Sequence, residues 1–139
     1  MKGDKIKYKG GYKHQLYEDY QLNVAIIPPK FPVDTPFLKL DMNGNLIIKA
    51  GYAWDGASGP TWDTPSCKRG ALIHDALYQL MREEKISLTN RNRADDLLRD
   101  ICIEDGMYKW RARLWHYFVG KAGLSSATTE GERKIIVAP

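Results

Sequence analysis

Four side chains that could do chemistry stand close together in the middle of the chain. An imidazole, a carboxylate, a phenol and a guanidinium fall within about two turns of one predicted helix: His74, Asp75, Tyr78 and Arg82. An imidazole near carboxylates is typical of general acid–base sites, and carboxylates are typical ligands of Ca²⁺ or Mg²⁺. These residue types therefore indicate a catalytic site, a cation site, or both.

The residues around His74 are spaced for a helix. At about 100° per residue, one apolar stripe is formed by Ile73, Ala76, Leu77 and Leu80. A second helical pattern begins near Arg91, and its apolar stripe is Ala94, Leu97, Leu98, Ile101 and Cys102. We expect Ser66 to cap the first helix, which would then begin at Cys67.

Two adjacent aspartates separate on the second predicted helix. Asp96 falls nearly opposite the apolar stripe, whereas Asp95 lies at its border. Because the connection is short, the helices should fold antiparallel about residue 86, with His74 within about one turn of Asp95. A carboxylate there could accept a hydrogen bond from the imidazole, fix its tautomer and raise its basicity.

We therefore interpret His74, Asp95 and Tyr78 as candidate catalytic residues, and Asp75 as a candidate cation ligand. Each also has a structural interpretation. Asp75 could pair with Arg82, Asp95 could pair with Arg91 one turn away, and the Tyr78 hydroxyl could lie in water. The other polar candidates are expected to be surface or packing groups: Asp63, Asp96, His14 and His116.

The segment before the first helix is rich in glycine. Gly51, Gly56 and Gly59 surround Asp55, and glycine lets backbone approach another segment, a ligand or an ion closely. Asp55 is accordingly a second candidate metal ligand. The alternative is that the glycines only serve turns and Asp55 satisfies its own backbone.

The rest of the chain predicts an α+β fold, with a small, mainly antiparallel sheet packed on a C-terminal three-helix cluster. The expected parts of a single domain 1–139 are an irregular segment 1–20, strands, hairpin and loop over 21–66, helices over 67–123, and a polar tail 124–139. A strand is expected at 22–27, ended by Pro28. Asn43-Gly44 marks a hairpin turn that needs two positive φ angles.

A third helix is expected over 109–119, stopped by Gly120 and Gly123. Its large apolar side chains are spaced for burial: Trp110, Leu114, Tyr117 and Phe118. Its basic residues are expected to be solvated, although a membrane surface or a phosphate partner would also suit them: Lys109, Arg111 and Arg113.

Composition limits the classes of function. A net charge of +4 favours an acidic partner only weakly and does not indicate a nucleic-acid binder. No apolar run reaches the roughly 20 residues that span a bilayer, and Met1–Lys5 lead into no apolar signal-peptide segment. Cys67 and Cys102 would be neighbours in the hairpin, so both a disulfide and two thiols stay open.

Three motifs in order carry a resemblance to a known family. They are Asp55-Gly56-Ala57-Ser58-x-Pro60, then Ala71-Leu72-Ile73-His74-Asp75-x-Leu77-Tyr78, then Arg91-x-x-Ala94-Asp95. Together with Trp110-x-Ala112 and Tyr117-x-x-Gly120, they resemble the domain-of-unknown-function family 1353 (DUF1353) across about 22–123. That resemblance implies a bacteriophage or prophage protein, located in the host cytoplasm or in the virion, and implies no particular activity.

A second similarity concerns mechanism. A glycine-rich loop, a helix with His-Asp-x-x-Tyr and an antiparallel helix with a supporting aspartate are also the order of elements in secreted phospholipases A2. The similarity implies His74 as general base, Asp95 as its orienting group, and Asp75 with loop carbonyls as ligands of Ca²⁺.

The leading hypothesis is a phage-encoded hydrolase, with or without a divalent cation such as Ca²⁺ or Mg²⁺. The competing hypothesis is a non-enzymatic virion or tail component, or a protein that binds a phage or host partner. In that case the site residues form a structural polar network, and Trp54 and Trp62 line a binding patch.

Overall fold

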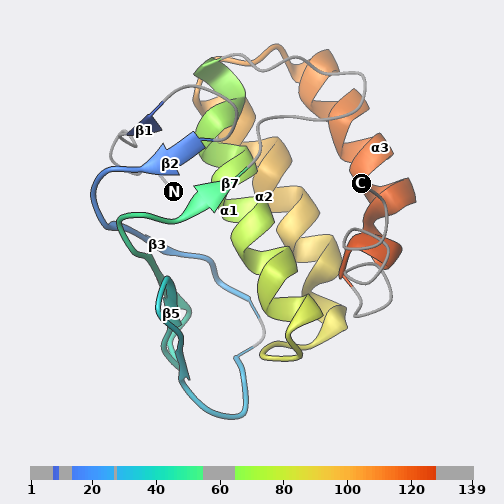
Figure 1. Cartoon of the computed structure of the whole chain (residues 1–139). Helices are drawn as coiled ribbons and strands as arrows, with labels where there is room; N and C mark the ends of the chain where they lie inside the picture. The colour runs from blue at the N-terminus through green and yellow to red at the C-terminus, as the bar shows by residue number, and fades with distance from the viewer. Residues whose placement is uncertain (1–7, 10–13, 27, 55–64, 128–139) are drawn as a thin grey trace, which may run out of the picture.

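The computed structural model describes residues 8–9, 14–26, 28–54 and 65–127. Short strands occupy the N-terminal half, and three helices follow (Figure 1). The strands are β1 (Tyr8–Lys9), β2 (His14–Leu16), β3 (Tyr20–Asn23), β4 (Val33–Asp34), β5 (Leu38–Leu40), β6 (Asn45–Ile48) and β7 (Ala53–Trp54). The helices are α1 (Pro65–Arg82), α2 (Arg91–Glu104) and α3 (Lys109–Ala127), with a 3-10 turn η1 (Leu88–Asn90) before α2.

The strands form two antiparallel sheets, one of order β1-β2-β7 and one of order β3-β6-β5-β4. In Figure 1, α1 and α2 run side by side in the centre, the strands lie on one side of them and α3 on the other. The buried side chains of sheets and helices form one hydrophobic cluster. The predicted α+β architecture of small antiparallel sheets and three packed helices is therefore confirmed.

Arg69, in the first turns of α1, connects the sheets to the helices. Its guanidinium is buried, donates two hydrogen bonds to the Asp105 carboxylate (2.9 and 2.8 Å) and one to the Tyr20 hydroxyl (3.2 Å). Burial alone would lower the pKa of Arg69, but the bonds to Asp105 and Tyr20 raise it above its ordinary value. One charged side chain thus joins β3, α1 and the end of α2.

Several predicted boundaries were wrong in the N-terminal half. Segment 1–20, expected to be irregular with room for one short strand, contains the two short strands β1 and β2, and the strand predicted at 22–27 is Tyr20–Asn23. It ends there because the Asn23 side chain accepts from the Ala25 amide (3.0 Å), and Ala25 takes a positive φ of 49°. The chain therefore turns before it reaches the prolines.

The hairpin of β5 and β6 is confirmed, but its turn differs from the expectation. Among residues 41–45 only Gly44 has a positive φ, of 87°. Asp41 accepts hydrogen bonds from the amides of Asn43 (2.8 Å) and Asn45 (2.9 Å), which holds a longer loop than a two-residue turn. One positive φ angle is enough for that loop.

The helix ends also differ from the predictions. α1 begins at Pro65, so Ser66 lies inside the helix and is not its cap. A helix can begin at a proline because the first backbone N–H groups of a helix have no partner within it. The second helix ends at Glu104, shortly before Gly106, which takes a φ of 106°. α3 continues through Gly120 and Gly123 to Ala127, because helical glycine is only mildly unfavourable. No helix in the described part of the chain is long and apolar enough to cross a bilayer.

The burial expected for the third helix was wrong. Over residues 109–121, where burial is described, the buried side chains are Ala112 and Trp115, whereas the residues expected to be buried are exposed: Trp110, Leu114, Tyr117 and Phe118. Lys109 and Arg113 are exposed as expected, and Arg111 is half-buried. α3 therefore packs on α2 through a different face from the one that Trp110, Leu114 and Tyr117 mark.

Candidate functional site

The candidate site lies where the middle of α1 faces the start of α2. These helices are antiparallel neighbours because residues 83–87 allow only a short return, as the sequence indicated. Their contact places Nε2 of His74 at 2.8 Å from Oδ1 of Asp95, so the predicted contact is confirmed. The His74 side chain is 12% exposed and that of Asp95 is 3% exposed, so this is a nearly buried pair at an edge that solvent still reaches.

Tyr78 completes this group. Its hydroxyl donates to the same Oδ1 of Asp95 at 2.6 Å, and its ring stacks on the His74 ring with centroids 4.2 Å apart. Burial first, and then the Asp95 carboxylate, raise the pKa of Tyr78 above its ordinary value. The phenol is therefore a fixed donor to Asp95, and the alternative of a hydroxyl in water is wrong.

The hydrogen bonds define what each group can do. An ionised carboxylate only accepts, so with Asp95 ionised, Nε2 of His74 carries the proton of this bond. The neutral imidazole then has its lone pair on Nδ1, which is the nitrogen able to take a proton. Asp95 is positioned to stabilise the imidazolium that results, as an orienting carboxylate does in a histidine–aspartate pair.

α3 closes the site on a further side through Gly120. A Cβ added at Gly120 would lie 4.0 Å from Oδ2 of Asp95, so this turn of α3 faces the second carboxylate oxygen. Arg91 donates to the Gly120 carbonyl at 3.4 Å and lies near enough to Tyr78 to oppose the rise of its pKa. The sequence had suggested Gly120 as a helix stop and Arg91 as a partner of Asp95; neither role is what the contacts show.

Asp75 points to another neighbourhood. The pKa of Tyr52 is raised by burial first and then by the Asp75 carboxylate, which places Asp75 beside the strand side of α1. The Tyr52 hydroxyl donates to Oε1 of Gln79 at 3.1 Å. Asp55 lies outside the described residues, and the described ones contain no group of three His, Cys, Asp or Glu arranged for a metal. The cation site at Asp75 and Asp55 stays a prediction.

The sequence interpretation missed a second histidine–aspartate pair. Nε2 of His116 on α3 lies 2.8 Å from Oδ1 of Asp96, and both side chains are about one-third exposed, at 32% and 39%. Asp96 also lies 3.7 Å from Arg99. The signal was the pair of adjacent aspartates, because 100° of helical rotation aims them at different neighbours.

Three further expectations concern residues near these helices. Trp54 is buried, so it cannot line an exposed binding patch as expected, and Trp62, Asp63 and the side chain of His14 lie outside the described residues. Cys102 is buried beside Gly70, and the side chain of Cys67 is outside the described part. Whether the two cysteines pair stays a prediction.

Comparison with known proteins gives a family and no activity. The model of a family described as "Protein of unknown function (DUF1353)" matches residues 31–119, which include both helices of the site. No curated protein and no solved structure matches the chain significantly.

Proposed function

The chain belongs to the DUF1353 family, and from its histidine–aspartate–tyrosine group we propose that it is a hydrolase with His74 as general base. One observation carries the proposal. A single buried oxygen of Asp95 accepts hydrogen bonds from both Nε2 of His74, at 2.8 Å, and the Tyr78 hydroxyl, at 2.6 Å. Such a fixed imidazole with an aspartate behind it is the arrangement that general-base catalysis needs.

The proposed step is the hydrolysis of an ester. Nδ1 of His74 accepts a proton from water while the water oxygen attacks the carbonyl carbon, and Asp95 stabilises the imidazolium. The ester C–O bond then breaks, and the imidazolium returns the proton to the leaving alcohol oxygen. Tyr78 keeps the carboxylate in place through its hydrogen bond and is a positioning residue in this scheme.

Two further parts of the proposal come from resemblance. The order of a glycine-containing segment, His74-Asp75-x-x-Tyr78 and Asp95 is similar to that of secreted phospholipases A2, which makes lipid and other carboxylic esters the first substrates to test. The DUF1353 motifs support a phage or prophage product that acts in the host cytoplasm or in the virion. The third part of the proposal is a divalent cation bound by Asp75, which is tested by measuring the activity with EDTA and with added Ca²⁺ or Mg²⁺.

The test compares the wild type with His74→Gln and Asp95→Asn on a panel of p-nitrophenyl esters and a phospholipid. Glutamine keeps a donor toward Asp95 but has no basic nitrogen, so we expect the rate to fall about 10²–10⁴-fold while the fold is retained. His116→Gln is the matched control, because His116 makes an equally short contact with Asp96. Full activity of His74→Gln, or an equal loss in His116→Gln, would contradict the assignment.

A second candidate function rests on the burial of the same group. Asp95 and Tyr78 are almost inaccessible, and their bonds hold α1 to α2, as expected of a structural network in a non-enzymatic phage protein. On that view, no ester is hydrolysed and His74→Gln and His74→Ala differ only in thermal stability. Measuring the melting temperature of both variants beside the rates separates the two candidates.

A further inference from the structure

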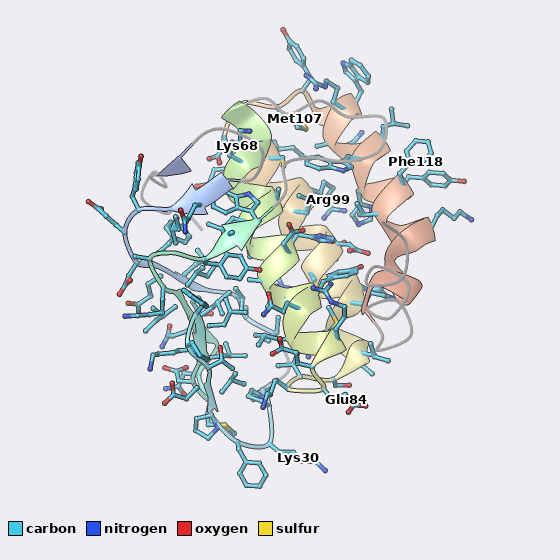
Figure 2. The ribbon with its side chains drawn as sticks, in the orientation of Figure 1. Lys30, Lys68, Glu84, Arg99, Met107 and Phe118 are labelled. Atoms are coloured by element: carbon cyan, nitrogen blue, oxygen red, sulfur yellow. The ribbon has the colours of Figure 1, made fainter. Side chains whose placement is uncertain are left out.

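α3 carries an apolar stripe on its solvent side as well as on its packed side. At about 100° per residue, Trp110, Leu114 and Tyr117 lie opposite Ala112 and Trp115, which are buried. Trp110 is 62% exposed and Tyr117 is 57% exposed, and Tyr108 and Phe118 extend the exposed apolar surface. Figure 2 shows Phe118 on the outer side of α3, away from α1 and α2. We call this set of five residues the outer stripe.

Such a stripe is unusual for the surface of a helix. Isolated exposed aromatic residues need no explanation, but half of the large exposed hydrophobic side chains in the described chain lie on this one element and the residue before it. The periodicity of the stripe is also that of a buried face. We therefore expect the outer stripe to be buried against a membrane or against another molecule.

The charges of α3 indicate what covers the stripe. The sequence Lys109–Ala127 contains no aspartate or glutamate, and exposed cations lie along the stripe: Lys109, Arg113 and Lys121. The ammonium group of Lys121 lies over the Tyr117 ring, 5.4 Å from its centroid. Lys109 and Arg113 share one flank of the stripe. Cations mixed with tryptophan and tyrosine are the composition of helices that lie in the headgroup region of anionic bilayers.

We propose that α3 is a peripheral membrane-binding helix, with the outer stripe seated in the headgroup region of an anionic phospholipid surface. Its exposed cations then contact lipid phosphates, and the rings of Trp110 and Tyr117 enter the boundary between headgroups and acyl chains. Binding takes place on the side of α3 away from α2, so His74 and Asp95 need not take part. The proposal is independent of any hydrolase activity.

The experiment is flotation of the full chain with vesicles of phosphatidylcholine alone or mixed with phosphatidylglycerol. We expect binding only to the anionic vesicles, with a fall in affinity as salt rises. Arg113→Gln with Lys121→Gln should weaken binding about 25-fold, since each cation near an anionic surface contributes about five-fold. Trp110→Ser with Tyr117→Ser should abolish binding, although the cations remain.

The matched controls lie outside α3. Lys30→Gln with Lys85→Gln removes two exposed cations, and Phe31→Ser removes an aromatic side chain that is 77% exposed. Lys30 lies at the strand end of the molecule in Figure 2, away from α3. These controls should bind vesicles as the wild type does. All positions are exposed, so circular dichroism should report an intact fold for every variant.

Two outcomes would overturn the proposal. One is a wild type that does not float with anionic vesicles, or controls that lose as much binding as the α3 variants. The other is a dimer in analytical ultracentrifugation that the Trp110→Ser, Tyr117→Ser variant dissolves, with no vesicle binding by either protein. The outer stripe would then be a contact between two copies of the chain.

Discussion

Asp95 accepts two hydrogen bonds on a single carboxylate oxygen, and this defines the chemistry of the residues around it. Because Nε2 of His74 and the Tyr78 hydroxyl share Oδ1, the loss of either donor leaves this buried oxygen with one hydrogen bond fewer. The predicted proximity of His74 and Asp95 followed from helical spacing and a short connection. The hydrogen bond from Tyr78 to Asp95 did not follow from the sequence. Helical spacing placed Tyr78 on the polar side of the helix and could not show that this side is buried.

Alkaline pH should report the contact between Tyr78 and Asp95. The pKa of Tyr78 is raised from 10.0, so its stabilising contribution is complete below pH 10 and is lost as pH rises toward the folded value. We expect the free energy of unfolding to fall above about pH 10, and Tyr78→Phe to make that fall shallower. Urea unfolding on either side of pH 10 measures this. Tyr108→Phe, at an exposed position, is the control, and equal slopes for wild type and Tyr78→Phe would refute the prediction.

At the scale of the helices, α1 packs tightly against α2 at Gly70. A Cβ there would lie 2.7 Å from Sγ of Cys102 and 3.2 Å from the Leu98 carbonyl oxygen, which is backbone and cannot move aside cheaply. We expect Gly70→Ala to lower the free energy of unfolding by about 1–3 kcal/mol, as overpacking does. Thermal or urea unfolding measures the loss.

Gly120→Ala is the matched comparison for Gly70→Ala. It is also a helical glycine, but its nearest neighbour across the gap would be 4.0 Å away, an ordinary contact. Better helix propensity should make Gly120→Ala neutral or more stable by up to about 1 kcal/mol. Cys102→Ala added to Gly70→Ala should recover part of the loss. A Gly70→Ala variant as stable as the wild type would show that the helices can separate slightly at no cost.

The packed face of a helix could be predicted where a single apolar stripe marks it, and the prediction failed where two opposite faces of the helix are apolar. The predicted stripes of α1 and α2 are buried, although α1 is also buried on other sides, at Ala71, Leu72 and Met81. α3 has Ala112 and Trp115 on one side and Trp110, Leu114 and Tyr117 on the other. Size and aromatic content favoured the second side, and only the position of α2 selects the first.

At the scale of the whole molecule, Arg69 joins parts that lie far apart in the sequence. Its partners are Tyr20 on β3 and Asp105 after α2, with Glu104 also 3.2 Å away. Arg69→Met should lower the free energy of unfolding by about 2–3 kcal/mol, less than for a fully buried pair, because the carboxylates are partly exposed. Arg99→Met removes the partly exposed contacts with Asp100 and Asp96 and should cost at most about 1 kcal/mol. Equal losses in urea unfolding would contradict a special role for Arg69.

The class of the fold could be predicted from strand patterns followed by helical ones, because local propensity and tertiary packing agree there. The connection made by Arg69 could not, since it depends on which strand lies over which end of α1. The same holds for Gly120 beside Asp95 and for the pair of His116 and Asp96. The last two contacts depend on the position of α3, which neither spacing nor composition determines.

The adjacent aspartates of α2 are tethered in different directions, Asp95 to His74 on α1 and Asp96 to His116 on α3. α2 is therefore held by α1 and by α3 at the same turn. Rotation about its axis would stretch one tether or the other, and sliding would stretch both. The two histidine–aspartate pairs therefore oppose both rotation and sliding of α2 between α1 and α3.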